Sequence, residues 1–288
     1  MYDGVAKFYD RYTADIQYEK IADFAENCFR LYGNPGIAET AGNKKTRSKK
    51  AVPPNTSSRQ NGEDVPYSTL VLDCACGTGT LTCLLAKRGY DMTGVDISRE
   101  MLQTASENAA ESGLDILWLC QDMRKINMYG SYAAVLCMTD GINHLTTEKQ
   151  LEAFFGRIYN FIDDGGLLIF DFLTPYHFEK NVGNNIFFED DENGSCLWTS
   201  SYQQKTGICV YDILLYECLE EDPSLYTRTE DRVREKAWPP EYIAETLRKK
   251  GFELCGLYDG FSFSPAAPDT ARVYAVARKP KTMAETEK

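Results

Sequence analysis

Long apolar runs are missing from this sequence. None of its 288 residues lies in an apolar stretch of the roughly 18 residues that a membrane-spanning helix requires. The N-terminal segment MYDGVAKFYDRY is polar and aromatic and lacks the apolar centre of a signal peptide. We therefore expect a cytoplasmic protein that does not enter a membrane.

The close spacing of cysteines and histidines that is typical of metal sites is also missing. The chain has 10 cysteines but no Cys-x-x-Cys pair, and its 2 histidines lie far from the densest cysteines. Most of the cysteines are scattered among apolar neighbours, as small core residues are: Cys28, Cys83, Cys120, Cys137, Cys209, Cys218 and Cys255. We predict reduced cysteines and no metal site.

Positive charge is in deficit. Lys and Arg number 31 against 43 Asp and Glu, which gives a net charge of −12. This balance disfavours bulk electrostatic binding of nucleic acid and is typical of an acidic, solvated surface. A basic cluster at residues 44–50 is the exception. It lies in residues 34–66, whose scarcity of large apolar side chains predicts a flexible insertion, and an RNA contact there stays open as an alternative.

Strand and helix patterns alternate through the middle of the chain. Apolar strands are predicted at residues 69–74, 90–96, 116–120, 132–138 and 166–172. Helices are predicted at residues 79–88, 98–112 and 147–161, with Ser98 as an N-cap and Thr147 and Gln150 in capping-box spacing. This alternation predicts an α/β fold with a doubly wound, mostly parallel sheet covered on both faces.

The alternation stops after Pro175. Residues 186–234 contain stretches of period two separated by turn residues such as Asn193 and Gly194, which predicts an antiparallel insert. The α/β pattern resumes with a helix at 240–250 and strands at 252–258 and 272–278. We divide the chain into an N-terminal helical cover (1–33), the insertion (34–66), a ligand-binding core (67–175), the insert (176–236), the end of the core (237–279) and a tail (280–288).

Polar and acidic residues close each apolar strand of the core. In chain order they are Asp73 with Gly77 and Gly79, then Asp96, then Gln121-Asp122-Met123, then Thr139-Asp140 with Asn143 and His144, and Asp171. Ligands of open α/β sheets bind at the carboxyl ends of the strands. The sequence therefore predicts one ligand site along this edge.

The first turn favours an adenosyl ligand with a positively charged tail. Gly77 and Gly79 allow a tight turn that approaches a ligand, and Asp96 follows Gly79 by 17 residues, where an acid binds ribose hydroxyls. The dinucleotide fingerprint is imperfect because Thr82 occupies its third glycine position. Asp73 at the head of the turn would repel a pyrophosphate, and no Gly-Lys-[Ser/Thr] motif is present.

These motifs resemble those of a known enzyme family. LDCACGTGTLT, GVDIS and CQDM are similar to the cofactor motifs of class I S-adenosylmethionine-dependent methyltransferases. FYDRYTADIQYEKIADF, TDGINHL and GGLLIFDFLTPYHF resemble a bacterial small-molecule branch that is similar to nucleotide-sugar N-methyltransferases. The resemblance implies a seven-stranded Rossmann-like sheet, a substrate lid formed by the insert, and S-adenosyl-L-methionine converted to S-adenosyl-L-homocysteine.

The resemblance also implies the cofactor-binding residues. Asp73 would hold the amino group of the cofactor, Asp96 the ribose and Asp122 the adenine amino group. The full set is Tyr9, Asp73, Ala75, Gly77, Gly79, Asp96, Ile97, Asp122, Met123 and Met138.

The acceptor side is less determined. His144 follows the fourth strand and is a candidate proton acceptor, although a structural role is the alternative, and His177 is less favoured. Candidate acceptor-binding residues are Asp140, Asn143, Asp171 and Trp198. The expected acceptor is a small molecule methylated on nitrogen or oxygen by a monomer or homodimer. An RNA methyltransferase, a non-catalytic binder of the cofactor and an NAD-dependent oxidoreductase are the alternatives.

Overall fold

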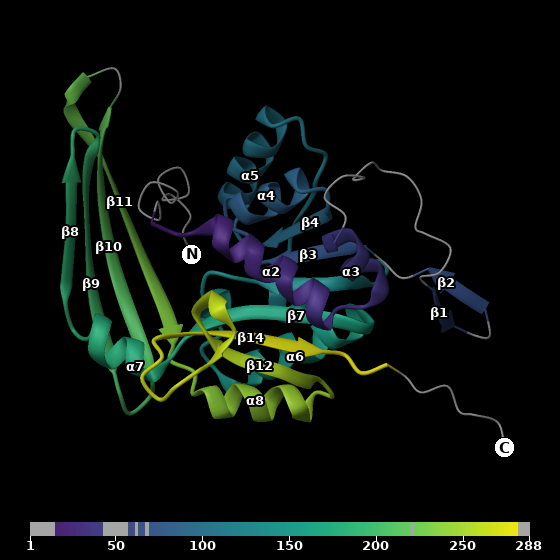
Figure 1. Ribbon diagram of the computed structural model, residues 1–288. Helices are drawn as coiled ribbons and strands as arrows, with labels where there is room; N and C mark the ends of the chain where they lie inside the picture. Colours follow the sequence, from purple (N-terminus) through teal and green to yellow (C-terminus); the bar gives the residue numbers. More distant parts are fainter. Residues whose placement is uncertain (1–14, 43–56, 61–62, 67–68, 220–221, 282–288) are drawn as a thin grey trace.

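A doubly wound sheet forms the centre of the protein (Figure 1). The computed structural model describes residues 15–42, 57–60, 63–66, 69–219 and 222–281. The sheet order is β13-β12-β14-β7-β6-β3-β4-β5. The parallel strands are β3 (Leu70–Cys74), β4 (Asp91–Asp96), β5 (Leu117–Cys120), β6 (Tyr132–Cys137) and β7 (Ile162–Leu173). The antiparallel strands are β14 (Arg272–Arg278), β12 (Glu253–Asp259) and the two-residue β13 (Ser264–Pro265), which extends the expected seven strands to eight.

Helices cover both faces of this sheet. The helices are α2 (Tyr18–Tyr32), α3 (Pro35–Gly42), α4 (Thr80–Lys87), α5 (Arg99–Glu111), α6 (Glu148–Phe161) and α8 (Pro240–Lys249). Val135 and Cys137 of β6 pack in the core formed with α6 and α8, whereas Ala134 and Leu136 pack in the core formed with α2 and α4. Successive side chains of a strand point to opposite faces, so both faces of β6 are apolar and buried. No helix among the described residues is both long and apolar enough to cross a membrane.

Local capping fixes where several helices begin. The Met101 N–H donates to Ser98 Oγ at 3.2 Å, and Thr147 and Gln150 form a reciprocal capping box, so both predicted caps are confirmed. The predicted flexible insertion is wrong for residues 35–42, which form α3. The Ile37 N–H donates to Asn34 Oδ1 at 3.1 Å, and Ile37 is fully buried in the core against α2. Of the remaining insertion, β1 (Ser57–Gln60) pairs with β2 (Glu63–Pro66), and residues 44–50 lie outside the described residues.

The predicted antiparallel insert is a separate sheet that stands beside the core (Figure 1). Its strands are β8 (Ile186–Asp191), β9 (Gly194–Gln203), β10 (Ile208–Leu219) and β11 (Asp222–Lys236), each paired antiparallel with the next. The short helix α7 (Pro175–His177) and the π-helical turn η3 (Phe178–Val182) lead from β7 into it. The end of β11 contacts η2 (Gly141–His144), which follows β6, and this contact brings the insert to the edge of the predicted site.

Candidate active site

The carboxylate of Asp96 joins the turns that follow β3 and β4. The Gly77 N–H donates to Asp96 Oδ2 at 3.0 Å, and the Ser98 N–H donates to Oδ1 at 2.8 Å. Ala75, Gly77 and Gly79 all have positive φ, of 55°, 54° and 75°, which bends the chain sharply between β3 and α4. The turn therefore exposes backbone and the Asp96 carboxylate side by side at the carboxyl edge of the sheet.

The two glycines of this turn have different roles. A Cβ added to Gly77 would have no heavy atom within 4 Å, so this side of the turn is open to a ligand. A Cβ on Gly79 would lie 2.5 Å from Cη2 of Trp118 and 2.9 Å from Cβ of Ala105. Gly79 lines neither of the two pockets at this turn, and its close packing against Trp118 accounts for a glycine here, while its predicted contact with the cofactor stays a prediction.

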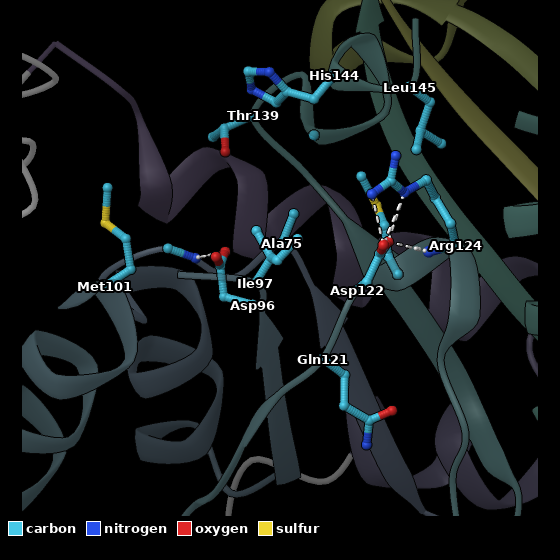
Figure 2. Close-up of a pocket in the computed structure, with 13 residues that line it drawn as sticks. Ala75, Asp96, Ile97, Met101, Gln121, Asp122, Arg124, Thr139, His144 and Leu145 are labelled. Carbon is cyan, nitrogen blue, oxygen red and sulfur yellow. Dashed lines mark hydrogen bonds and ion pairs between the residues drawn. The ribbon is translucent and has the colours of Figure 1, made fainter. Parts of the chain in front are cut away.

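Two pockets adjoin at this turn. The larger pocket, drawn in Figure 2, contains seven of the predicted residues: Ala75, Gly77, Asp96, Ile97, Asp122, Met123 and His144. The smaller pocket lies on the other side of the turn and is lined by Asp73, Met138 and Tyr18, among others. Ala75, Gly77 and Thr139 line both pockets. The structure thus provides an elongated site with an acid in each half.

Asp73 is the buried acid of the smaller pocket. Its side chain is nearly inaccessible, at 3% exposure, and Thr82 Oγ1 donates to its Oδ2 at 2.5 Å. Burial raises the pKa of Asp73 to about 7, the charge of Asp96 adds to this, and the Thr82 hydrogen bond opposes it. Sequence reasoning used Thr82 only as a departure from the dinucleotide fingerprint and missed that its hydroxyl orients Asp73.

Arg124 forms an ion pair with the carboxylate of Asp122. Its Nε donates to Oδ1 at 2.8 Å and its Nη2 to Oδ2 at 2.6 Å, as the dashed lines in Figure 2 show. This hydrogen bonding lowers the pKa of Asp122. Asp122 also begins the 3₁₀ turn η1 (Met123–Lys125) by accepting from the Arg124 N–H at 2.9 Å. The expected contact between Asp122 and an adenine amino group would have to share this carboxylate with Arg124, which the sequence did not reveal.

Acidic side chains gather where β6 and β7 end. Arg272 of β14 pairs with Asp140 at 2.7 Å and also with Asp171, and the Asp140 N–H donates to Asp171 Oδ2 at 3.1 Å. Thr139 and Asp140 both adopt positive φ, near 55°, which places η2 and His144 over the larger pocket. Burial raises the pKa of Asp171, while Arg272 opposes that rise.

His144 faces an acid from the insert. Its Nε2 lies 4.0 Å from Oε1 of Glu235 on β11, and both side chains are largely buried. Burial lowers the pKa of His144, so the neutral imidazole is favoured at neutral pH. Sequence reasoning missed Glu235, because no local motif marks a residue that only the insert brings to this edge.

Two further predicted residues, Asn143 and Trp198, do not line these pockets. Asn143 is buried, donates to the carbonyls of Leu173 and Lys236, and accepts from the Leu173 N–H, so its polar atoms hold η2 against the ends of β7 and β11. Trp198 stacks on Phe187 within the insert sheet, with ring centroids 5.2 Å apart. Tyr9 lies outside the described residues.

The chain is similar to several known methyltransferases. Residues 71–166 match the family model described as methyltransferase domain. The putative methyltransferase YqeM of Bacillus subtilis (strain 168) is 29% identical over 220 residues, which are 76% of this chain and 87% of that protein. A glycine/sarcosine N-methyltransferase of Halorhodospira halochloris is 33% identical over 106 residues, 36% of this chain and 40% of the relative. A solved S-adenosylmethionine-dependent methyltransferase from Clostridium acetobutylicum ATCC 824 is similar in structure, with a TM-score of 0.76 at 24% identity. The match covers 97% of this chain and 99% of the Clostridium chain.

The matched methyltransferase domain begins within β3 and ends within β7, and so covers the turn after β3 and the ends of β4 to β6. The likeness of the chain to the Clostridium structure extends over the insert and shows that the whole chain has the fold of an S-adenosylmethionine-dependent methyltransferase.

The two glycines of the first turn should respond differently to substitution. Gly79→Ala forces a Cβ against Trp118 and Ala105, and we expect it to lower the free energy of unfolding by about 2–4 kcal/mol. Gly77→Ala meets no neighbouring atom and should cost only about 1–2 kcal/mol for its positive φ. Urea denaturation of the three proteins measures this, and equal losses for the two variants would contradict the assignment.

Proposed function

We propose that this protein transfers the methyl group of S-adenosylmethionine to a nitrogen or oxygen atom of a small-molecule acceptor. The observation that carries the proposal is the elongated site itself. A buried carboxylate, Asp73, lines the smaller pocket, a second carboxylate, Asp96, lies at the turn, and Ile97 and Asp122 line the larger pocket with His144. One ligand with an ammonium tail, a ribose and an adenine would match Asp73, Asp96, and Ile97 with Asp122, in that order.

The residues present fit the cofactor. Asp73 would pair with its ammonium group, and the two Asp96 oxygens, each already oriented by one backbone N–H, would accept from the ribose hydroxyls. Ile97 is 53% exposed at the wall of the larger pocket, which offers an apolar surface for a purine ring. Met138 lines the smaller pocket, and its carbonyl would be a second partner for the ammonium.

The protein's own contribution is alignment and proton control. When bound, S-adenosylmethionine supplies a methyl group that its sulfonium already activates. The chain therefore needs to orient the acceptor atom and exclude water, rather than form a covalent intermediate. His144, which is neutral and lines the same pocket, would accept the proton of the acceptor.

Other functions have weaker support. Buried Asp73 would oppose the pyrophosphate of a dinucleotide, which argues against an oxidoreductase. An RNA methyltransferase would depend on residues 44–50, which lie outside the described residues. Deletion of that segment should abolish RNA binding if RNA is the acceptor. Transfer of labelled methyl groups to any small molecule separates an enzyme from a non-catalytic binder.

Cofactor affinity should increase with pH because of Asp73. With a pKa of about 7 in the unliganded protein, only about a tenth of Asp73 is ionised at pH 6 and most of it is ionised at pH 8, so affinity for the ammonium-bearing cofactor should rise about tenfold. Asp73→Asn should remove this pH dependence and bind at least tenfold more weakly at pH 8. Calorimetric titration at both pH values tests this, and a wild-type affinity that is flat with pH would refute it.

The same pKa shift predicts how the unliganded protein responds to pH. The folded-state pKa of Asp73 is raised above its usual value of 3.8, so the folded state favours the protonated form. The contribution of Asp73 to stability should therefore decline as pH rises from about 4 to about 7. Asp73→Asn should abolish that decline in urea denaturation, whereas Asp91→Asn on an exposed strand end should retain it.

Asp96 should be essential for cofactor binding. Asp96→Ala removes the acceptor for both ribose hydroxyls and releases the Gly77 N–H, so we expect at least a tenfold weaker affinity. Asp91→Asn, at the opposite end of β4, is the matched control and should bind normally. Calorimetry that finds unchanged affinity for Asp96→Ala would remove the ribose assignment.

His144 should set the acid side of the pH–rate profile. Because burial lowers its pKa below the usual 6.5, the rate should fall only where pH drops below that value and the imidazole takes up a proton. His144→Asn should lose this limb and reduce kcat by about 100-fold. His177→Asn changes the chain's other histidine, which lines neither pocket, and should keep the wild-type profile. Identical profiles for all three proteins would exclude the proton-acceptor role.

A further inference from the structure

The turn that follows β6 has a strained backbone. Thr139 and Asp140 are successive residues with φ of 56° and 55°, in the left-handed region that glycine adopts easily and other residues rarely do. Thr139 is β-branched, which makes this conformation still less favourable. Such residues cluster at functional sites and keep their conformation only where the surrounding structure imposes it. The contacts around this turn are therefore the ones that hold it in place.

Arg272 lies at the centre of these contacts. It is the first residue of β14, and its guanidinium pairs with Asp140 at 2.7 Å and also with Asp171 of β7. The Asp140 N–H in turn donates to Asp171 Oδ2 at 3.1 Å. Groups from two paired strands thus fix the turn through both its side chain and its backbone. A planar guanidinium can hold two carboxylates at once, which the single ammonium of a lysine does not reproduce.

His144 lies at the other end of the same short segment. The four residues of η2 begin directly after Asp140, and the Asn143 N–H donates to the Asp140 carbonyl at 2.8 Å. Gly141 packs so closely that an added Cβ would lie 3.2 Å from Cβ of Ala75, in the turn after β3. Ala75 and His144 both line the larger pocket (Figure 2). A change in the backbone of Asp140 would therefore move His144 relative to that pocket.

We propose that Arg272 is a positioning residue for methyl transfer: by pairing with both acids at once, it holds the strained turn that carries His144 at the larger pocket. The inference rests on the proposed function and adds to it a residue that lines neither of the two pockets. Loss of Arg272 should alter the placement of His144 and leave the cofactor-binding carboxylates Asp73 and Asp96 as they are.

Arg272 also offsets negative charge that faces His144. The acids around this imidazole are Asp140 on its own turn, Asp96 at the end of β4 and Glu235 on β11. Burial lowers the pKa of His144, and the charges of Asp140 and Asp96 oppose that fall. Without the cation that pairs with Asp140, this carboxylate would favour the protonated imidazole more strongly. The pKa of His144 should then rise.

Proton NMR of the full-length protein follows this histidine directly. The chain has 2 histidines, so His177→Asn leaves His144 as the source of the imidazole signals and serves as the reference protein. Adding Arg272→Gln should raise the pKa of His144 by about 0.5 or more, because Asp140 loses its cation. Adding Arg272→Lys keeps the positive charge and should change this pKa by less than about 0.2.

The placement of His144 is measured by its response to S-adenosylhomocysteine. In the reference protein, binding of this ligand should shift the imidazole signals, because His144 lines the larger pocket. Arg272→Gln and Arg272→Lys should both reduce that shift about twofold or more, since neither side chain holds the two acids together. Calorimetry should find that both variants bind S-adenosylhomocysteine within about threefold of the reference affinity, because Asp73 and Asp96 are unchanged.

Two further variants show whether the effect belongs to the strained turn. Arg278→Gln removes a paired arginine from the other end of β14 and should match the reference protein in both NMR measurements. Thr139→Gly supplies a residue that adopts positive φ without a Cβ penalty, so the turn should depend less on Arg272. In that background, the fractional loss of signal shift caused by Arg272→Gln should be about twofold smaller.

Several results would overturn the proposal. These are a reference protein whose His144 signals do not respond to S-adenosylhomocysteine, a full response in both Arg272 variants, or the same loss in Arg278→Gln. A tenfold or greater loss of ligand affinity in both Arg272 variants would make Arg272 a general structural residue instead. If thermal unfolding shows that Arg272→Gln does not fold, Arg272→Lys decides by itself. Failure of the unsubstituted protein to bind S-adenosylhomocysteine would refute the proposed function, and calorimetry on that protein alone identifies this case.

Discussion

The site depends on the two hydrogen bonds that the carboxylate of Asp96 accepts. It accepts from the Gly77 N–H on one side and the Ser98 N–H on the other, and so connects the turns after two neighbouring parallel strands. Ser98 in turn caps α5, and Gly77 shapes the entry to α4. One charged group therefore positions two helix starts and leaves its remaining lone pairs directed at the same edge of the sheet.

Buried acids impose the second constraint. Asp73, Asp171 and Glu235 are all nearly inaccessible, and burial raises the pKa of each. A fold tolerates such groups where partners offset their desolvation, and Thr82 and Arg272 do this in part for the first two. The remaining desolvation cost of these acids would fall if a positively charged ligand were bound beside them.

The insert and the core meet in a small area with a large effect on the site. Asn143 binds the carbonyls of Leu173 and Lys236, and this three-way contact fixes η2, the end of β7 and the end of β11 relative to one another. Because His144 and Glu235 flank the same contact, a change in the packing of the insert would alter the distance between Glu235 and His144 at the larger pocket.

The sequence alone determined the parallel sheet, the antiparallel insert, the caps at Ser98 and Thr147, and the edge that carries Asp73, Asp96 and Asp122. These follow from local signals: hydrophobic periodicity, capping chemistry, and acids placed directly after apolar strands. Only the tertiary structure decided that Gly79 accommodates Trp118, that Thr82 and Arg124 hold the acids, and that Glu235 joins His144. Those contacts join residues on different elements, and side-chain spacing along one chain carries no information about which of them will meet.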